Sequence, residues 1–480
     1  MEISYGELSF GVNERYRDEM LVETSVDTAE RGGAQKVLSL EAEAKVSSVE
    51  LLEGEAEVSG KVNYRLLYLD RQGRLCGLDY FKDFKCRVKG DSVTPGGRSA
   101  VILQVPDAEA RIKNEEVELS AVVDVTFCYY GEAQKRAVAS VTEAETRTEE
   151  ISASCVTVKE RVVELDKVVD VGLGVKKIVL FGAEAIPCEV KDGTASGEVR
   201  GTILYLNDAD EVAELTVSLP FSEVSDAAEA AATVKSARVI LTDDEEGNAV
   251  ETEVTLSLTE TFYETAAQTA VTAVCGEKSV VEEVREGARD VRFVGAKRFE
   301  ESLAGTVTLP ETGAVSFVRP GCHAVAEVTV GEGEVKVEGV AAFRVIYQTE
   351  EGYRAEQGEL PFAYDLPLAE AKPGMVAEVS VKVTDAAGSA KGKDAQVTAK
   401  VFLEVRLFEE RRYCYLSDAK EGAPIPESDA GISVYFAEKG EDVWNIAKNM
   451  GVPPSALIKA NPFLVDPIEE PRKILIFRQK

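Results

Sequence analysis

Hydrophobic and polar residues alternate along much of the chain, so that every second side chain is hydrophobic. The clearest example spans residues 55–68, and its hydrophobic positions are Ala56, Val58, Val62, Tyr64, Leu66 and Tyr68. A period of two places these side chains on one face of an extended strand, with polar side chains on the other. The pattern returns at Val335, Val337, Ala341, Phe343, Val345 and Tyr347. Both segments therefore predict half-buried β-strands.

One motif within this pattern occurs three times. A glycine is followed eight residues later by a tyrosine, and a phenylalanine comes 15 or 16 residues after the tyrosine. The copies are Gly60, Tyr68 and Phe84; Gly197, Tyr205 and Phe221; and Gly339, Tyr347 and Phe362. Successive tyrosines are 137 and 142 residues apart, which gives the length of one repeated module. The repeated glycine predicts a β-bulge or a close approach of two backbones.

A second alternating segment follows in each copy, at residues 117–127, 254–258 and 397–407. In the middle copy Glu260 interrupts the alternation, which predicts a β-bulge there. Turn-forming residues separate the short strands, and few stretches have a helical period. We therefore expect a mainly β chain, with three tandem antiparallel β-sandwich or barrel-like modules and a small C-terminal βααβ domain.

The length of 480 residues also favours several domains. We place the three β modules at residues 1–150, 151–275 and 276–416. Residues 417–431 contain two prolines, two glycines and several charged residues, which is typical of a linker. The fourth domain then covers residues 432–480.

The residues of this fourth domain predict the order strand, helix, helix, strand. Asp442 is placed to cap a first helix, and Gly451 to end that helix in the left-handed conformation. Pro454 suits the first turn of a second helix. The face of the first helix would be Val443, Ile446, Ala447 and Met450. The apolar residues 474–477 close the domain as a strand.

This segment resembles the LysM family over roughly 45 residues. The residues that carry the resemblance are Tyr435, Gly440, Ile446, Ala447, Gly451, Val452, Leu457, Ile458, Asn461 and Pro462, while Glu441 and Asp442 stand where the family has Asp-Thr. The resemblance implies a shallow groove between the loop after the first strand and the loop before the last, which binds polymers that contain N-acetylglucosamine, such as peptidoglycan or chitin. Carried over by position, the groove residues are Gly440, Glu441, Asp442, Val443, Asn461, Pro462 and Ile468.

Two side chains of this domain have alternative roles. The only tryptophan, Trp444, either packs the helices onto the sheet or stacks on a ligand. We expect the packing role, in which case Trp444→Ala would unfold the domain at a cost of roughly 3–5 kcal/mol. Asn461 is interpreted as a helix-end residue that could also contact a ligand.

The formal net charge is −32, which would repel phosphate backbones and anionic lipids, so we expect neither nucleic-acid binding nor membrane insertion. Residues 432–480 hold seven basic and six acidic residues, so the other 431 residues carry −33. The N-terminal residues do not resemble a secretory signal, and no run of 18 apolar residues occurs, so we expect a cytoplasmic protein. The eight scattered cysteines are then expected to be reduced.

The chain lacks residues that most hydrolase mechanisms require. Cys–His, Ser–His and zinc hydrolases require histidine, and His323 is the only one in the chain. Its neighbour Cys322 would project to the opposite face of an extended strand, so the two would form no dyad. A glycosidase needs only two carboxylates, but the acidic residues lie mainly on polar strand faces and in charged connections. We expect no enzyme, and no catalytic, cofactor-binding or metal-binding residue.

Tandem acidic β modules before a single LysM-like domain resemble the family of spore-coat morphogenetic proteins of the SipL and SpoVID type, whose repeats are SPOCS domains. The resemblance implies a scaffold or tether on the mother-cell side of the forespore, where the LysM domain binds a coat ATPase of the SpoIVA type. The alternative is an anchor protein that binds peptidoglycan through the same groove. The two hypotheses predict different partners, a protein and a glycan.

Overall fold

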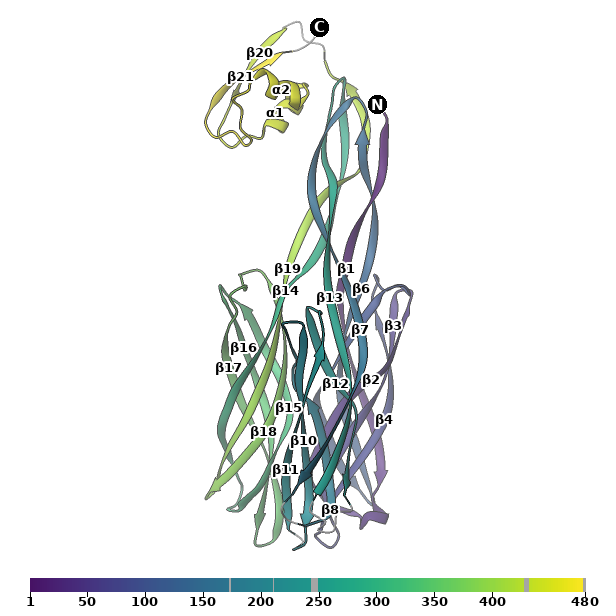
Figure 1. Cartoon of the computed structure of the whole chain (residues 1–480), viewed down its shortest axis with the longest axis vertical. Coiled ribbons are helices and arrows are strands. Elements are labelled where there is room, and N and C mark those ends of the chain that lie inside the picture. The colour runs from purple at the N-terminus through teal and green to yellow at the C-terminus, as the bar shows by residue number, and fades with distance from the viewer. Residues whose placement is uncertain (172–173, 210, 243–248, 427–430, 478–480) are drawn as a thin grey trace.

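The computed structural model describes residues 1–171, 174–209, 211–242, 249–426 and 431–477. The molecule is elongated (Figure 1). A wide body formed by three β modules lies at one end, a narrow stalk of paired strands rises from it, and the C-terminal domain lies beside the far end of the stalk. No helix in these ranges is long and apolar enough to cross a membrane.

Each module consists of two antiparallel sheets with the same strand order. Module 1 contains β1 (Ile3–Asp27), β6 (Glu116–Val141) and β5 (Arg98–Lys113) in one sheet, and β2 (Ala34–Leu52), β3 (Glu55–Asp70) and β4 (Leu75–Lys89) in the other. Module 2 contains β7 (Ala144–Asp170), β13 (Ala249–Gly276) and β12 (Glu229–Leu241), and then β8 (Val175–Ala185), β10 (Thr194–Asn207) and β11 (Val212–Val224), with β9 (Glu189–Lys191) beside β10. Module 3 contains β14 (Ser279–Thr308), β19 (Asp394–Pro424) and β18 (Val376–Lys391), and then β15 (Ala314–Val330), β16 (Glu334–Thr349) and β17 (Gly352–Pro367). The mainly β class and the antiparallel sheets are confirmed.

The hydrophobic face of each alternating strand lies in the core between the two sheets of its module. Val62 and Tyr64 of β3 are fully buried in module 1, and Phe343 and Val345 of β16 are fully buried in module 3. The other face of β3 was expected to be exposed to solvent, but it is buried as well. Arg65 is 4% exposed and Leu67 is 1% exposed, because this face packs against the other two modules.

The repeated glycine and phenylalanine lie opposite each other on neighbouring strands. Gly60 pairs with Phe84, Gly197 with Phe221, and Gly339 with Phe362. A Cβ atom on Gly60 would lie 2.4 Å from Cζ of Phe84, and one on Gly197 would lie 2.5 Å from Cζ of Phe221. The strand on the other side of Gly60 and of Gly339 carries a register shift at that point. The predicted close approach of two backbones holds at Gly60, where the Cβ would lie 2.4 Å from Lys45 O, but Gly197 meets only side chains. A bulge lies opposite Gly60 and Gly339.

The bulge predicted at Glu260 is not there. Glu260 pairs regularly with Ala230 and with Lys159, and the register shift between β12 and β13 comes earlier, between Val234 and Ser236. The extra residue therefore belongs to β12. The sequence of β13 alone therefore could not locate the bulge, because the extra residue lies in the neighbouring strand.

Two predicted domain limits cut through strands. The limit at residue 150 falls inside β7, and β19 continues through residues 417–424, which had been interpreted as linker. Residues 427–430 of that segment lie outside the described residues. Both limits are wrong for the same reason, which is that the long strands extend past their module. We call the extensions the stalk: residues 3–12 paired with 131–141, 144–155 with 264–276, and 279–288 with 413–424.

The stalk is three two-stranded ribbons packed around a hydrophobic interior. That interior contains Leu8, Phe10, Val138, Ile151, Val271, Val274, Val281, Tyr415 and Leu416. Side chains from one ribbon satisfy backbone groups of the next. The amide of Gln268 accepts from Ser9 N at 2.9 Å and donates to Ser9 O at 2.6 Å, and Asp290 accepts from Ser154 N at 2.8 Å. Edges that would otherwise stay open are therefore partly closed within the molecule.

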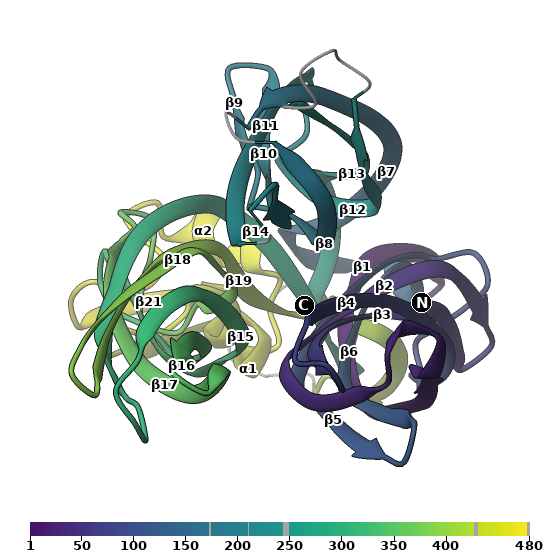
Figure 2. The same cartoon turned by 90° about the horizontal axis from the view of Figure 1, so that it is seen from below.

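The three modules surround a common axis, as the view along the stalk shows (Figure 2). Leu67, Leu204 and Ile346 come from equivalent positions of the three repeats, one residue before each repeated tyrosine, and all belong to one buried cluster at the centre. Arg319 of module 3 adds a buried ionic connection. Its Nε lies 2.7 Å from Glu41 of module 1 and its Nη1 lies 3.4 Å from Glu214 of module 2. The body is therefore one unit with an internal pseudo-threefold arrangement.

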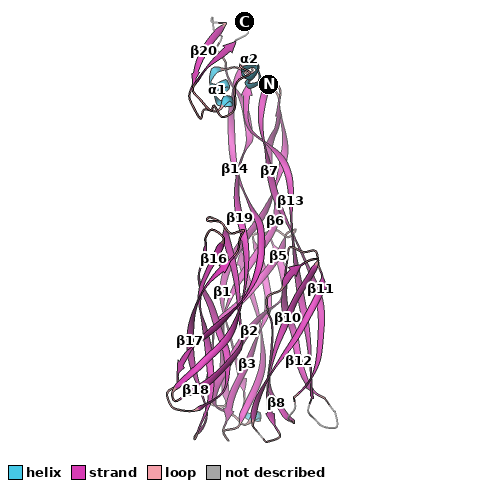
Figure 3. Ribbon diagram, turned by 60° about the vertical axis from the view of Figure 1, so that its left-hand side comes forward, coloured by secondary structure: helices cyan, strands magenta, loops and turns pink. Residues whose placement is uncertain are grey.

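The C-terminal domain has the predicted order of elements. It contains β20 (Ile432–Ala437), α1 (Val443–Met450), α2 (Pro454–Ala460) and β21 (Arg472–Phe477), and β20 pairs antiparallel with β21. Asp442 caps α1 by accepting from Asn445 N at 3.1 Å, and Gly451 ends α1 at φ +64°. Apart from the short 3₁₀ turn Ala29–Arg31, the described helices lie in this domain (Figure 3).

Candidate functional site

The two loops that were expected to form a groove come together in the C-terminal domain. Gly440 N donates to Ile468 O at 2.7 Å, and Ile468 N donates to Glu441 O at 2.9 Å. Val443 N donates to Oδ1 of Asp466 at 3.0 Å, so a third contact joins the same loops. Gly440 has φ +90°, which is the left-handed region that glycine adopts without strain.

Most of the expected groove residues have structural roles here. Val443 and Ile468 are buried in the hydrophobic core of the domain. Asn461 is fully buried; its amide nitrogen donates to Leu457 O and Leu475 O at 2.9 and 2.7 Å, and its amide oxygen accepts from Leu475 N at 2.8 Å. Asn461 is therefore the helix-end residue that was predicted, and it joins α2 to β21. Pro462 is exposed.

The carboxylate of Glu441 is also used within the loops. It accepts from the Tyr435 hydroxyl at 2.8 Å and from Glu438 N at 2.8 Å. These bonds fix the turn that follows β20. Of the seven expected groove residues, Asp442 is the other one with a charged side chain.

Asp442 faces the stalk. Its Oδ2 lies 2.5 Å from Nη1 of Arg147 on β7, while its Oδ1 caps α1. Burial by itself raises the pKa of Asp442, but the bond to Arg147 and the α1 amides outweigh it and hold the pKa below its usual range. Arg147 also interacts electrostatically with Asp466, so its guanidinium lies beside both loops. A side chain of the stalk therefore occupies one side of the expected groove.

Further contacts hold the helices of the domain against the stalk. Nζ of Lys448 lies 2.6 Å from Oε1 of Glu283, and Ser455 N donates to Oε2 of Glu145 at 2.9 Å. The thiol of Cys275 lies 3.6 Å from Val452 O, in a buried position between the two parts. We call these contacts, with the pair Arg147 and Asp442, the docking interface. Its paired residues are more than 160 positions apart, so sequence spacing gives no signal for them.

Trp444 is half-buried on α1 and lies outside the core of the domain. The core cluster contains Val443, Ile446 and Ala447, with Met450 packed against it, and does not include Trp444. Trp444 shares a helix face with Lys448, four residues later. Gly451 flanks the same face, where an added Cβ would lie 2.6 Å from Ile425. The predicted packing of the ring between helices and sheet is therefore wrong, because the small core is filled by aliphatic side chains.

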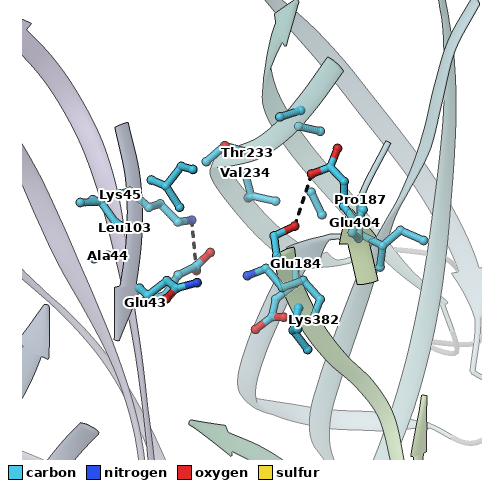
Figure 4. Close-up of a pocket in the computed structure, with 18 of the residues that line it drawn as sticks. Glu43, Ala44, Lys45, Leu103, Glu184, Pro187, Thr233, Val234, Lys382 and Glu404 are labelled. Carbon is cyan, nitrogen blue, oxygen red and sulfur yellow. Dashed lines mark hydrogen bonds and ion pairs between the residues drawn. The ribbon is translucent and has the colours of Figure 1, made fainter. Parts of the chain in front are cut away.

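A second candidate site is a cavity of about 720 Å³ between the three modules (Figure 4). Eight acidic and eight basic side chains line it, together with many aliphatic residues. Figure 4 shows Glu43 and Lys45 of module 1 on one wall, across from Glu184 of module 2 and Lys382 of module 3. The cavity is charge-balanced, in contrast to the acidic chain as a whole.

Most of the charges in this cavity neutralise each other. Lys45 lies 3.4 Å from Glu43, and Arg406 lies 3.1 Å from both Glu404 and Glu229. Burial raises the pKa of Glu404, although Arg406 opposes this. In the part of the chain with defined coordinates, Glu184 and Lys382 form no ion pair. The cavity therefore has the balanced charge pattern of a polar interface between modules.

His323 lines the cavity, and its imidazole is bonded to the backbone. Its Nε2 lies 2.7 Å from the carbonyl oxygen of Val381, and burial and the charge of Lys382 hold its pKa below the usual value. Burial and Asp107 raise the pKa of the Cys322 thiol, so it is not a thiolate at neutral pH. The thiol interacts with Asp107 and the backbone of Ala108 in module 1, whereas the imidazole bonds to Val381 of β18, so the two side chains have different partners. Within the described ranges, no group of three His, Cys, Asp or Glu residues could hold a metal ion.

The sequence of the body matches one known domain family. The family model described as SipL, SPOCS domain, matches residues 34–113 and 318–390. The first segment is β2 to β5 of module 1, and the second covers the equivalent strands of module 3. Module 2 has the same strand order through β8 to β12. No curated protein and no solved structure matches the chain.

Proposed function

We propose that this chain is a non-catalytic scaffold in spore-coat assembly, and that its C-terminal domain binds a coat morphogenetic protein of the SpoIVA ATPase type. The observation that carries the proposal is the match of two modules to the SPOCS domain of SipL. The expected site of action is the cytoplasm of the mother cell, at the forespore surface. There the C-terminal domain would act as a LysM-like module that binds protein.

The shape of the molecule supports a tether. The body is held together by the central cluster around Leu67, Leu204 and Ile346, and by the ion pairs of Arg319. The stalk places the C-terminal domain far from the body (Figure 1). The two ends are therefore free to contact different partners at once.

The glycan-binding alternative has less support from the contacts. Among its expected groove residues, Asn461 and Glu441 are used in internal hydrogen bonds, and Asp442 pairs with Arg147 of the stalk. A sugar would have to compete with these bonds. We therefore favour a protein partner.

The test is a binding measurement with the full chain and purified ligands. One arm offers a SpoIVA-type ATPase, and the other offers N-acetylglucosamine oligomers and peptidoglycan fragments. We expect saturable binding of the ATPase and none of the glycan. Binding of glycan alone would contradict the proposal and support the anchor hypothesis.

A further inference from the structure

The outer face of the β20–β21 sheet is an apolar surface. Ile432 lies opposite Phe477, Val434 opposite Leu475, and Phe436 opposite Lys473. All six side chains are exposed, with exposed fractions between 41% and 66% for the five apolar residues. Five of the six outward positions are thus apolar on a surface that water reaches. Exposed contiguous apolar patches mark interaction sites when, together with their surroundings, they reach a few hundred Å².

The remaining sides of the domain are occupied. The helices cover the inner face of the sheet, where Ile474 and Ile476 join the domain core. The docking interface holds α1 and the capping loop against the stalk through Asp442 and Lys448. Figure 1 shows the helices on the side toward the stalk, with β20 and β21 on the far side. The docked domain therefore presents this sheet face outward.

Three carboxylates lie in the loops at one end of the face, where β20 ends and β21 begins. Glu438, Glu469 and Glu470 are exposed and form no ion pair within the residues that the structure defines. Two lysines, Lys439 and Lys473, are exposed near them, and Nζ of Lys473 lies 5.4 Å from the centre of the Phe436 ring. The formal charge of −32 on the whole chain adds to this negative field. Charge complementarity therefore favours a partner with basic residues around an apolar segment.

A second copy of the chain fits the face less well. Two six-residue strands cover roughly 200 Å², at about 3.3 Å per residue and 4.8 Å between strands. A specific, stable interface buries about 800 Å² on each partner, so any occupant must also contact surface around the face. Two copies would bring these carboxylates and the acidic stalks together. A different protein can add contacts of opposite charge at these carboxylates.

We propose that the outer face of β20 and β21 is the surface on which the C-terminal domain binds its protein partner, and that the partner contributes an apolar segment flanked by basic residues. This proposal rests on the proposed function and assigns the surface that performs it. The loops around Asp442 keep the domain docked on the stalk. Recognition and docking thus use opposite sides of one small domain.

The test measures binding of the SpoIVA-type ATPase to full-length variants. The double substitution Phe436→Thr and Leu475→Thr removes apolar area from the face and keeps residues that suit a strand. We expect at least tenfold weaker binding. Ile458→Ala is the matched control, because Ile458 is 49% exposed but lies on α2; it should change binding less than twofold.

The carboxylates at the end of the face are tested separately by Glu469→Lys with Glu470→Lys at low salt. We expect association to slow several-fold, because the basic flanks of the partner lose their attraction. Faster association would overturn the assigned charge of the partner. Circular dichroism and melting temperature check that each variant is folded.

The outcomes separate the two proposals. If the unchanged chain fails to bind the ATPase, the proposed function is wrong. If it binds, and the double variant at Phe436 and Leu475 binds equally well, the function stands and the assigned surface is wrong. Light scattering on the unchanged chain tests whether a second copy of the chain binds the face. A dimer that the double variant abolishes would show that the face joins two copies, and would overturn the proposal.

Discussion

The ring of Phe221 on β11 lies over Gly197 on β10, at the position that a side chain on residue 197 would need. The two residues pair directly, and an added Cβ would lie 2.5 Å from Cζ and 2.8 Å from Cε1 of the ring. An aromatic ring that covers a cross-strand glycine compensates for its missing side chain. The same residue types pair in the other two modules. The motif is therefore a packing unit and requires no ligand.

Gly197→Ala should destabilise the chain, because the added methyl group meets the ring of Phe221 in a packed core. We expect a loss of about 1–3 kcal/mol in the free energy of unfolding, measured with urea. The clash is with the side chain, so the same substitution in a Phe221→Leu background should cost less. Equal costs in the two backgrounds would show that the ring does not impose the glycine.

The sequence predicted those features that depend on local spacing. Alternation predicted strands such as β3, and the triplicated glycine, tyrosine and phenylalanine predicted three equivalent modules. In the C-terminal domain, Asp442 and Gly451 predicted both ends of α1. Each of these signals lies within one element or two neighbouring elements.

Features that depend on contacts between distant segments could not be predicted. Leu67 stands at a position where the alternation called for a polar residue, and the structure explains it because the second face of β3 meets the other modules. The stalk was missed because its strands simply continue those of the modules. The docking of Asp442 on Arg147 joins residues 295 positions apart, with no motif to connect them.

Arg319 holds the three modules together, and its loss should weaken the whole body. Arg319→Met leaves Glu214, whose side chain is 25% exposed, without a cation, and it removes one of two arginines from Glu41. Burial already raises the pKa of Glu214. Breaking a buried ion pair on one side costs about 3–5 kcal/mol, so we expect a loss of that size in urea unfolding.

Two further variants test the cause of that loss. Adding Glu214→Gln to Arg319→Met should restore part of the stability, since the stranded charge is removed. The exposed pair of Arg111 and Glu109 provides a control, and Arg111→Ala should cost less than about 1 kcal/mol. A similar cost for the two arginine variants would contradict the connecting role of Arg319.

Docking of the C-terminal domain should weaken in acid. The pKa values of Asp442 and Glu283 are held below their usual range, because Arg147 and Lys448 outweigh the effect of burial. A carboxyl group with a lowered pKa in the docked state stabilises docking above its ordinary pKa of about 4, and this contribution is lost as the pH falls through the lowered value. Undocking is therefore expected below about pH 4.

The thiol of Cys275 reports this change. It is 2% exposed at the docking interface, and burial raises its pKa to about 11. Labelling by dithiodipyridine, followed by peptide mapping, should be slow at pH 5.5 and faster at pH 3.5. The variant Arg147→Ala with Lys448→Ala should label quickly at both values. Protection that persists in that variant would show that these ion pairs do not hold the domain.

Trp444→Ala should release the domain from the stalk without unfolding it. The ring lies on the helix face that carries Lys448, and its Nε1 is buried without a hydrogen-bond partner in the described structure. The core of the domain does not contain the ring, so hydrogen exchange in α1 should stay protected. Losing an aromatic contact of about 1.4 kcal/mol would raise the labelling rate of Cys275 about tenfold. Phe436→Ala on the outer face is the control, because it removes a ring of similar size and should leave Cys275 protected. If Trp444→Ala instead unfolds α1, the ring supports the domain itself, and the docking interface depends on its polar contacts alone.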